Sequence, residues 1–209
     1  MSDEIPVKDA DLDELKREMR SAQWMDWVEA NKNALIGAVA VVLIVLIATG
    51  LWLENDRAQR ATAATVYQQA VSEISPSKKQ SLLESVSRDF ADSTYSALAL
   101  MQLAALDRAN AEAHLNALIA HDKAMEEWVW QARIDLAEIK MAAGDQVAAK
   151  ALLEQSVGEQ YQQLRLYLLA QISADESEKQ QYLQRALDAP STDPELKQKI
   201  EMQMSKKVS

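Results

Sequence analysis

Hydrophobic and polar positions divide the chain into one uninterrupted apolar stretch and a long region with alternating helical faces. Residues 34–53 contain no charged side chain, and twelve of these twenty residues are Leu, Ile or Val. A helix of this length is about 30 Å long, which matches the hydrocarbon core of a bilayer. The flanking residues 1–33 and 54–209 contain no comparable apolar run. The pattern therefore predicts one transmembrane helix over residues 34–53, between an acidic N-terminal segment and a soluble C-terminal domain.

Three tryptophans lie just outside or at the ends of the predicted span: Trp24, Trp27 and Trp52. Indole rings are enriched at headgroup depth, so we expect these residues to be membrane-interface anchors. Contact of Trp24 and Trp27 with a partner protein is the alternative. Within residues 1–33, apolar side chains at helical spacing predict a short amphipathic helix, and they are Leu12, Leu15, Met19 and Ala22.

The distribution of Lys and Arg predicts the orientation of the span. Within twenty residues of its ends, four basic residues lie on the N-terminal side and two on the C-terminal side, which favours a cytoplasmic N-terminus and a translocated C-terminal domain. A cleaved signal peptide is disfavoured, because its apolar core is only about 7 to 15 residues long and follows a short basic segment. Residues 1–33 instead carry five basic and nine acidic side chains.

From Glu54 onward the chain is rich in Ala, Leu, Gln, Glu and Lys and poor in Gly and Pro, which predicts an all-α fold. No Gly or Pro lies between Leu51 and Ile74, so the first helix is expected to continue directly from the transmembrane helix. Turn residues divide the rest into further helices. The predicted helices are Glu54–Ile74, Lys78–Phe90, Ser93–Arg108, Ala111–His121, Lys123–Ala143, Gln146–Val157, Glu159–Ser173, Glu176–Asp188 and Pro194–Met204.

A repeat signature stands out between Trp130 and Ser156. Its small and large residues have the spacing of a tetratricopeptide repeat, in which a Gly-Asp turn joins two antiparallel helices. Small residues permit close approach of the two helices, and leucines fill the space around them. The signature residues are Leu136, Ala137, Gly144, Asp145, Ala149 and Leu153.

Weaker copies of this pattern span Tyr95–Leu118 and begin near Gln160, where the matching residues include Leu166, Tyr167, Asp175, Leu183 and Ala186. A single hairpin has too little surface to bury its own apolar face, so it must stack on its neighbours. The predicted architecture is a tetratricopeptide-like α-solenoid of about four helical hairpins over residues 54–209. The helix from Pro194 is expected to cap it.

Four aromatic residues of this domain have two interpretations. They either pack between hairpins or line a protein-binding groove, and packing is the simpler interpretation for any one of them. They are Trp128, Trp130, Tyr161 and Tyr167.

Charge and composition exclude several function classes. The net charge is −10, so no basic surface is available to neutralise a nucleic-acid backbone. The absence of cysteine removes thiolate catalysis and Cys-containing metal sites. His114 and His121 are seven residues apart, which does not match a metal pair on a helix, and we expect two exposed polar residues on one helix face. No phosphate-binding loop occurs, and the acidic residues are scattered. We therefore expect no cofactor, no metal and no enzymatic activity.

The layout of an acidic tail, one span and a directly continuing helix, together with Thr94–Ala104 and Arg133–Gln155, resembles the YfgM-type ancillary SecYEG translocon subunit family. The resemblance implies a bacterial inner-membrane protein with its repeat domain in the periplasm. The implied partners are the SecYEG translocon and periplasmic chaperones that receive emerging polypeptides, and the implied role is that of a scaffold or chaperone-assisting subunit. A repeat-containing adaptor of another cell-envelope complex is the alternative, because both functions require only a protein-binding surface.

Overall fold

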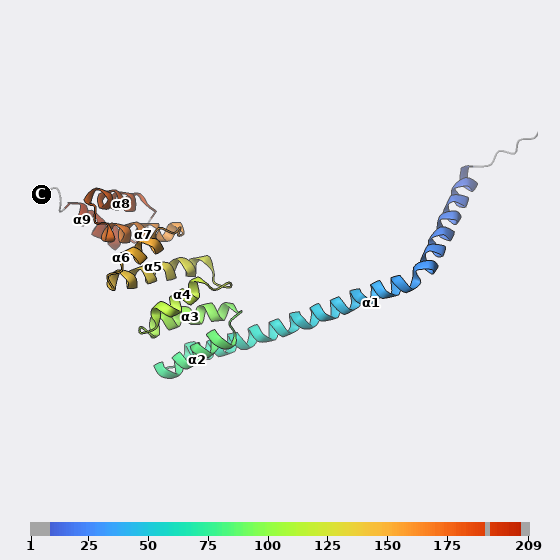
Figure 1. The fold of residues 1–209 in the computed structure, drawn as a ribbon, viewed down its shortest axis with the longest axis horizontal. Coiled ribbons are helices and arrows are strands. Elements are labelled where there is room, and N and C mark those ends of the chain that lie inside the picture. Colours follow the sequence, from blue (N-terminus) through green and yellow to red (C-terminus); the bar gives the residue numbers. More distant parts are fainter. Residues whose placement is uncertain (1–8, 191–192, 206–209) are drawn as a thin grey trace, which may run out of the picture. The chain divides into compact units, whose positions relative to one another are not determined.

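The computed structural model describes residues 9–190 and 193–205, and every helix or strand assigned in them is an α-helix (Figure 1). The all-α prediction is therefore confirmed. The chain divides into two compact units, with the boundary between Arg57 and Ala58. The described helices are α1 (Asp9–Ser72), α2 (Pro76–Asp89), α3 (Thr94–Leu106), α4 (Ala111–Ile119), α5 (Glu126–Ala142), α6 (Gln146–Leu153), α7 (Glu159–Ile172), α8 (Glu176–Asp188) and α9 (Pro194–Ser205).

The described residues of the first unit belong to α1 alone. This helix begins at Asp9, so the short amphipathic helix expected near the N-terminus is not a separate element in the structure. Residues 1–8 and the side chains of Leu12, Leu15 and Ala22 lie outside the described part of the chain. As predicted, the apolar stretch and the first helix of the C-terminal region form one continuous helix, which ends at Ser72.

The second unit comprises the last residues of α1 together with α2 to α9, and from α2 onward each helix packs against the next one in the chain (Figure 1). Three hydrophobic clusters hold these helices together. The first joins α1, α2 and α3, the second joins α3, α4 and α5, and the third joins α5 to α9. Neighbouring clusters therefore share α3 or α5, as expected for hairpins that bury their apolar faces only by stacking.

Helix α7 is the most deeply buried element of this unit. Its residues Leu166 to Ala170 are all buried, so apolar contact surrounds the helix instead of covering one face. Polar side chains of α7 bond to its neighbours. The amide of Gln163, which is 2% exposed, donates to the carbonyl of Ala186 at 3.1 Å, and Gln171 donates to Gln203 of α9 at 3.0 Å.

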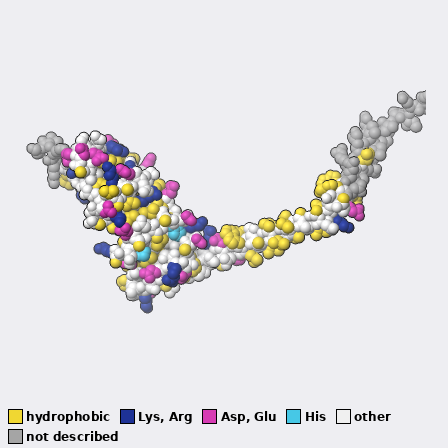
Figure 2. Space-filling model, in the orientation of Figure 1, with side chains coloured by type: hydrophobic (Ala, Val, Ile, Leu, Met, Phe, Trp, Pro, Cys, Tyr) yellow, Lys and Arg dark blue, Asp and Glu magenta, His cyan; other side chains and the backbone are white. Residues whose placement is uncertain are grey.

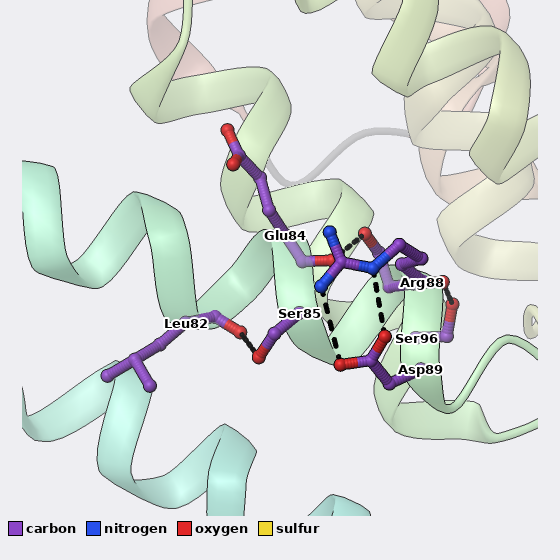
Figure 3. Close-up of polar contacts among 7 residues, drawn as sticks. Leu82, Glu84, Ser85, Arg88, Asp89 and Ser96 are labelled. Atoms are coloured by element: carbon purple, nitrogen blue, oxygen red, sulfur yellow. Dashed lines mark hydrogen bonds and ion pairs between the residues drawn. The ribbon is translucent and has the colours of Figure 1, made fainter.

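Figure 3 shows polar contacts of α2, including the hydrogen bond that joins it to α3. The hydroxyl of Ser96 donates to the carbonyl of Ser87 at 3.2 Å, which links the two helices. The backbone N–H of Ser96 in turn donates to the hydroxyl of Ser93, the N-cap of α3. Arg88 pairs with the adjacent Asp89, with 2.9 Å between Nε and Oδ1. The polar groups at this hairpin therefore have partners within the domain.

Two predicted helix boundaries differ clearly from the structure. Helix α6 ends at Leu153 and not at Val157, because Arg165 of α7 donates to the carbonyls of Leu153 at 2.9 Å and Gln155 at 3.5 Å. These bonds satisfy carbonyls that the end of a helix leaves unpaired. Helix α5 begins at Glu126, since the preceding chain forms a turn in which the N–H of Lys123 donates to Nδ1 of His121.

Candidate functional site

The apolar stretch of α1 has the properties of a membrane anchor. No residue of 34–53 is buried. Even large apolar side chains are exposed, and Ile44 and Ile47 have 65% and 62% of their surfaces exposed. Figure 2 shows hydrophobic side chains covering this part of the helix. The hydroxyl of Thr49 donates to the carbonyl of Val45 at 2.7 Å, so its polar group has a partner within the helix. By length and composition, this is the one helix in the described residues able to cross a membrane.

The three candidate interface tryptophans are all exposed on α1. Trp24 and Trp27 pack edge to face, with 5.7 Å between their ring centroids. Trp52 lies at the other end of the apolar stretch with 65% of its surface exposed. Their role at a membrane interface stays a prediction.

The turn between α5 and α6 explains two residues of the repeat signature. Gly144 has a φ of +80°, in the left-handed region that side chains disfavour. Asp145 is the N-cap of α6, where its carboxylate accepts a hydrogen bond from the N–H of Ala148 at 3.0 Å. Glycine ends α5 and aspartate starts α6, so these two residues form the hairpin turn.

The other four signature residues form the interior of this hairpin. Ala137 and Ala149 are fully buried, and Leu136 and Leu153 are 2% and 1% exposed. Ala137 and Leu153 belong to the cluster that includes α7, whereas Leu136 belongs to the cluster that includes α3 and α4. The α5–α6 hairpin therefore contributes to the packing on both of its sides.

The four aromatic candidates do not form one surface. Tyr167 is 6% exposed and lies in the core cluster around α7, with the ammonium of Lys199 placed 5.3 Å from its ring centroid. It therefore belongs to the packing alternative. Tyr161 is partly buried against the same cluster.

Trp130 packs on the backbone at the start of α7. A Cβ atom built on Gly158, the N-cap of α7, would lie only 2.2 Å from the Trp130 ring. The close approach of the ring therefore requires glycine at this position. Trp130 therefore packs at the junction between α5 and α7. The sequence alone did not decide between packing and groove lining for this residue.

Trp128 lies on another face of α5 and lines a hollow of about 500 Å³. Helices α3, α4 and α5 enclose this hollow, and its floor includes Leu115 and Leu118, which are 3% and 1% exposed. The remaining apolar lining is Met101, Ala104, Ala105, Ala132, Ile139 and Ala142.

Polar side chains of α5 border the same hollow: Gln131, Asp135 and Glu138. The amide of Gln131 donates to Oδ1 of Asp135. Burial raises the pKa of Asp135 above its ordinary value of 3.8, and the bond from Gln131 opposes this shift. Burial, followed by repulsion from Asp135, also raises the pKa of Glu138. The hollow thus combines an apolar floor with the partly buried carboxylate of Asp135 and the exposed carboxylate of Glu138.

The electrostatic influence of Asp135 extends to Tyr161 on α7. Burial is the largest cause of the raised pKa of this phenol, and the negative charges of Asp135 and Glu127 add to it. The charge of Asp135, at the border of the hollow, therefore acts on a phenol of the neighbouring helix α7.

Comparison with protein-family models gives a match over residues 25–205, to the family described as "Tetratricopeptide repeat-like domain". This range covers most of the chain and includes both the apolar stretch and helices α2 to α9. The chain belongs to the tetratricopeptide repeat-like domain family. No curated protein and no solved structure matches it in the corresponding searches.

Tetratricopeptide repeat-like domains are generally non-catalytic scaffolds whose stacked hairpins offer surfaces for protein contact. Among the described residues, no group of three or more His, Asp or Glu side chains is arranged to hold a metal ion. The expectation of two exposed histidines on one helix face is wrong. His121 lies beyond the end of α4, and both rings are partly buried, with His114 Nε2 placed 3.5 Å from Asp107 Oδ2.

Sequence reasoning missed one carboxylate of this tetratricopeptide repeat-like domain, Asp135, which is partly buried at the hollow. Glu138 at the same border is exposed. A signal was nevertheless present, because Trp128, Gln131, Asp135 and Glu138 follow one another at intervals of three or four residues, which places them on the same face of α5.

Proposed function

We propose that this protein is a non-enzymatic scaffold, anchored in the bacterial inner membrane, that assists the Sec translocon by guiding emerging polypeptides to periplasmic chaperones. The observation that carries the proposal is the combination of an apolar stretch of α1, residues 34–53, in which no residue is buried, with a tetratricopeptide repeat-like domain that has an unfilled hollow. The helix supports anchoring, because exposed Leu, Ile and Val side chains are stable in lipid and not in water. The hollow supports contact with another protein.

The association with the translocon rests on the resemblance to the YfgM-type family. The segments that carry this resemblance, Thr94–Ala104 and Arg133–Gln155, lie in α3 and in the α5–α6 region. The proposed partners are therefore SecYEG and a membrane-anchored or soluble periplasmic chaperone, with unfolded chains as clients.

The proposed topology places the N-terminus in the cytoplasm and the repeat domain in the periplasm. It is supported by four basic residues near the N-terminal end of the span against two near its C-terminal end. Protease added to intact spheroplasts should digest the domain after Leu53. Protection of the domain, in spheroplasts that digest a periplasmic control protein, would place it in the cytoplasm and overturn the proposal.

Co-purification tests the translocon association directly. The full-length protein, extracted in a mild detergent, should retain SecY, whereas an unrelated single-span protein of the same membrane should not. Reproducible absence of SecY from the preparation would reject the association. A periplasmic domain without SecY, but with a stable set of other envelope proteins, would instead indicate an adaptor of a different complex.

A further inference from the structure

The hollow between α3 and α5 has an apolar floor that nothing in the described part of the domain fills. Its α3 side is formed by Met101, Ala104 and Ala105, and two of these three side chains are as small as a methyl group. Leu115 and Leu118 of α4 form the base. A volume of about 500 Å³ accommodates a few side chains and not a whole helix, and it lies within the usual range of binding pockets.

Two carboxylates at the border of this hollow lack a cationic partner. Among the described residues, neither Asp135 nor Glu138 forms an ion pair with Lys, Arg or His. They lie three residues apart on α5, so their negative charges repel each other, and this repulsion adds to burial, the larger cause, in raising the pKa of Glu138. A positive charge placed between them would relieve this repulsion and offset the cost of the partial burial of Asp135.

Several acidic side chains elsewhere in the domain have cationic partners. Asp89 pairs with Arg88 (Figure 3), Glu112 with Lys140, and Glu178 with Lys150 at 3.6 Å. Lys140 lies on α5 only two residues from Glu138, yet its ammonium bonds to Glu112 of α4. Lys140 is therefore engaged by α4 and forms no ion pair with the carboxylates at the hollow.

We propose that the hollow between α3 and α5 binds a segment of a partner protein in which a Lys or Arg lies next to a large apolar side chain. The apolar side chain enters the space above Leu115 and Leu118, and the cation reaches Asp135 and Glu138. The Trp128 ring adds an aromatic face that favours a guanidinium or an ammonium. Anionic occupants such as nucleic acid or acidic lipid are disfavoured by the same two carboxylates.

This inference rests on the proposed scaffold function and specifies the chemistry of the bound segment. Charge complementarity carries it: the apolar floor alone would accept any hydrophobic segment, whereas the unpaired carboxylates select a basic one. The selectivity should fall with added salt only in part, because partly buried charge pairs are screened less than exposed ones.

The test measures binding of a short fluorescent peptide, in which Lys and Arg alternate with Leu and Phe, to the full-length protein in a lipid nanodisc. Two comparison peptides carry Gln or Glu in place of every basic residue. The basic peptide should bind about tenfold or more tightly than the Gln peptide, and the Glu peptide should bind most weakly. Equal binding of all three peptides would overturn the proposal.

Matched variants locate the binding. Asp135→Asn combined with Glu138→Gln should remove the preference for the basic peptide. The control combines Glu195→Gln with Glu201→Gln on α9, where both residues are exposed, and it changes the net charge equally. Ala105→Phe fills the hollow without altering any charge and should also weaken binding. Unchanged affinity in both the Asp135/Glu138 and the Ala105 variants would reject the hollow as the site.

The outcome separates this inference from the proposed function. Retention of SecY by the Asp135/Glu138 variant, together with unchanged peptide binding, would reject the hollow while the scaffold function stands. Loss of SecY from the native protein, with selective binding of the basic peptide, would reject the translocon association while the hollow keeps its specificity.

Discussion

Helix α5 takes part in two junctions that differ in how completely they are packed. Toward α7, the junction is filled by Ile134 and Ala137 against the buried run of α7, and Trp130 covers Gly158. Toward α3, the same helix borders a hollow of about 500 Å³. One helix of a repeat domain thus serves as a packing element on one face and as the wall of an open hollow on another.

Side-chain size on the opposing helices explains this difference. Helix α7 presents Leu166, Leu168 and Leu169, which are each at most 5% exposed. Helix α3 presents Ala104 and Ala105 toward the end where the hollow lies. Since the helix backbones are held apart by the larger residues of the shared cores, small residues on one helix leave space instead of drawing the helices together.

The largest effect is expected from a cavity in the filled junction. Leu166→Ala removes a side chain that is 2% exposed, and it should lower the free energy of unfolding by about 2 to 5 kcal/mol. Met101→Ala, beside the hollow, should cost less than half as much, because Met101 is only partly buried. Urea unfolding followed by circular dichroism measures both. Similar losses would show that the two junctions are equally packed.

Added volume tests the same comparison from the opposite direction. Ala137→Leu introduces three carbon atoms at a fully buried position and should destabilise the domain by about 1 to 3 kcal/mol through overpacking. Ala105→Leu points toward free space and should change stability by less than about 0.5 kcal/mol. Thermal unfolding of the two variants measures the difference. A marked destabilisation by Ala105→Leu would mean that the hollow has no room for a guest.

The turn that positions α6 against the filled junction gives a smaller effect. Asp145→Ala removes the acceptor for the N–H of Ala148 and should cost about 1 kcal/mol. Asp145→Asn keeps an acceptor oxygen at the N-cap and should remain close to the native protein. Chemical denaturation compares the pair, and an equal loss in both variants would exclude capping as the cause.

The smallest effect concerns the pH dependence at the open junction. Because burial raises the native pKa of Asp135 above 3.8, the native state takes up its proton at a higher pH than the unfolded state. This residue therefore destabilises the domain once the pH exceeds its native pKa, and the penalty disappears as the pH falls below that value. Asp135→Asn should be more stable than the native protein at pH 7.

The stability advantage of Asp135→Asn should shrink as the pH is lowered toward 4. Denaturant midpoints of the two proteins, measured in parallel between these pH values, cancel the contributions of carboxylates that Asp135 does not influence. Glu138 and the phenol of Tyr161 also respond to the charge of Asp135. A difference that stays constant with pH would show that ionisation of Asp135 does not affect folding.

Much of the fold was predictable from the sequence, because the signals are local. The uncharged stretch, the absence of Gly and Pro between Leu51 and Ile74, and the Gly144–Asp145 turn each act within a few residues. The end of α6 was not predictable, since it depends on hydrogen bonds from Arg165, twelve residues beyond Leu153. Such a contact exists only once α7 has packed.

The site was harder to predict than the fold for the same reason. The ring of Trp128 would suit a packed core as well as the border of a hollow. Its neighbours on α3 determine that it borders a hollow. Tyr167 had the same appearance in the sequence, yet its surroundings on α7 and α9 bury it. The partial burial of Asp135 also depends on the helices packed around α5, so no local pattern distinguishes it from a solvated carboxylate.

The bond between Arg165 and the end of α6 has a consequence for local opening of the domain. Helix α6 has only eight residues, fewer than an isolated helix needs to persist in water. Its amide protons are therefore protected from exchange with solvent only while its packing on α5 and α7 holds it in place. Hydrogen exchange at α6 should consequently report how often α7 undocks, and Arg165→Met should accelerate that exchange before it alters the exchange of α3 or α4.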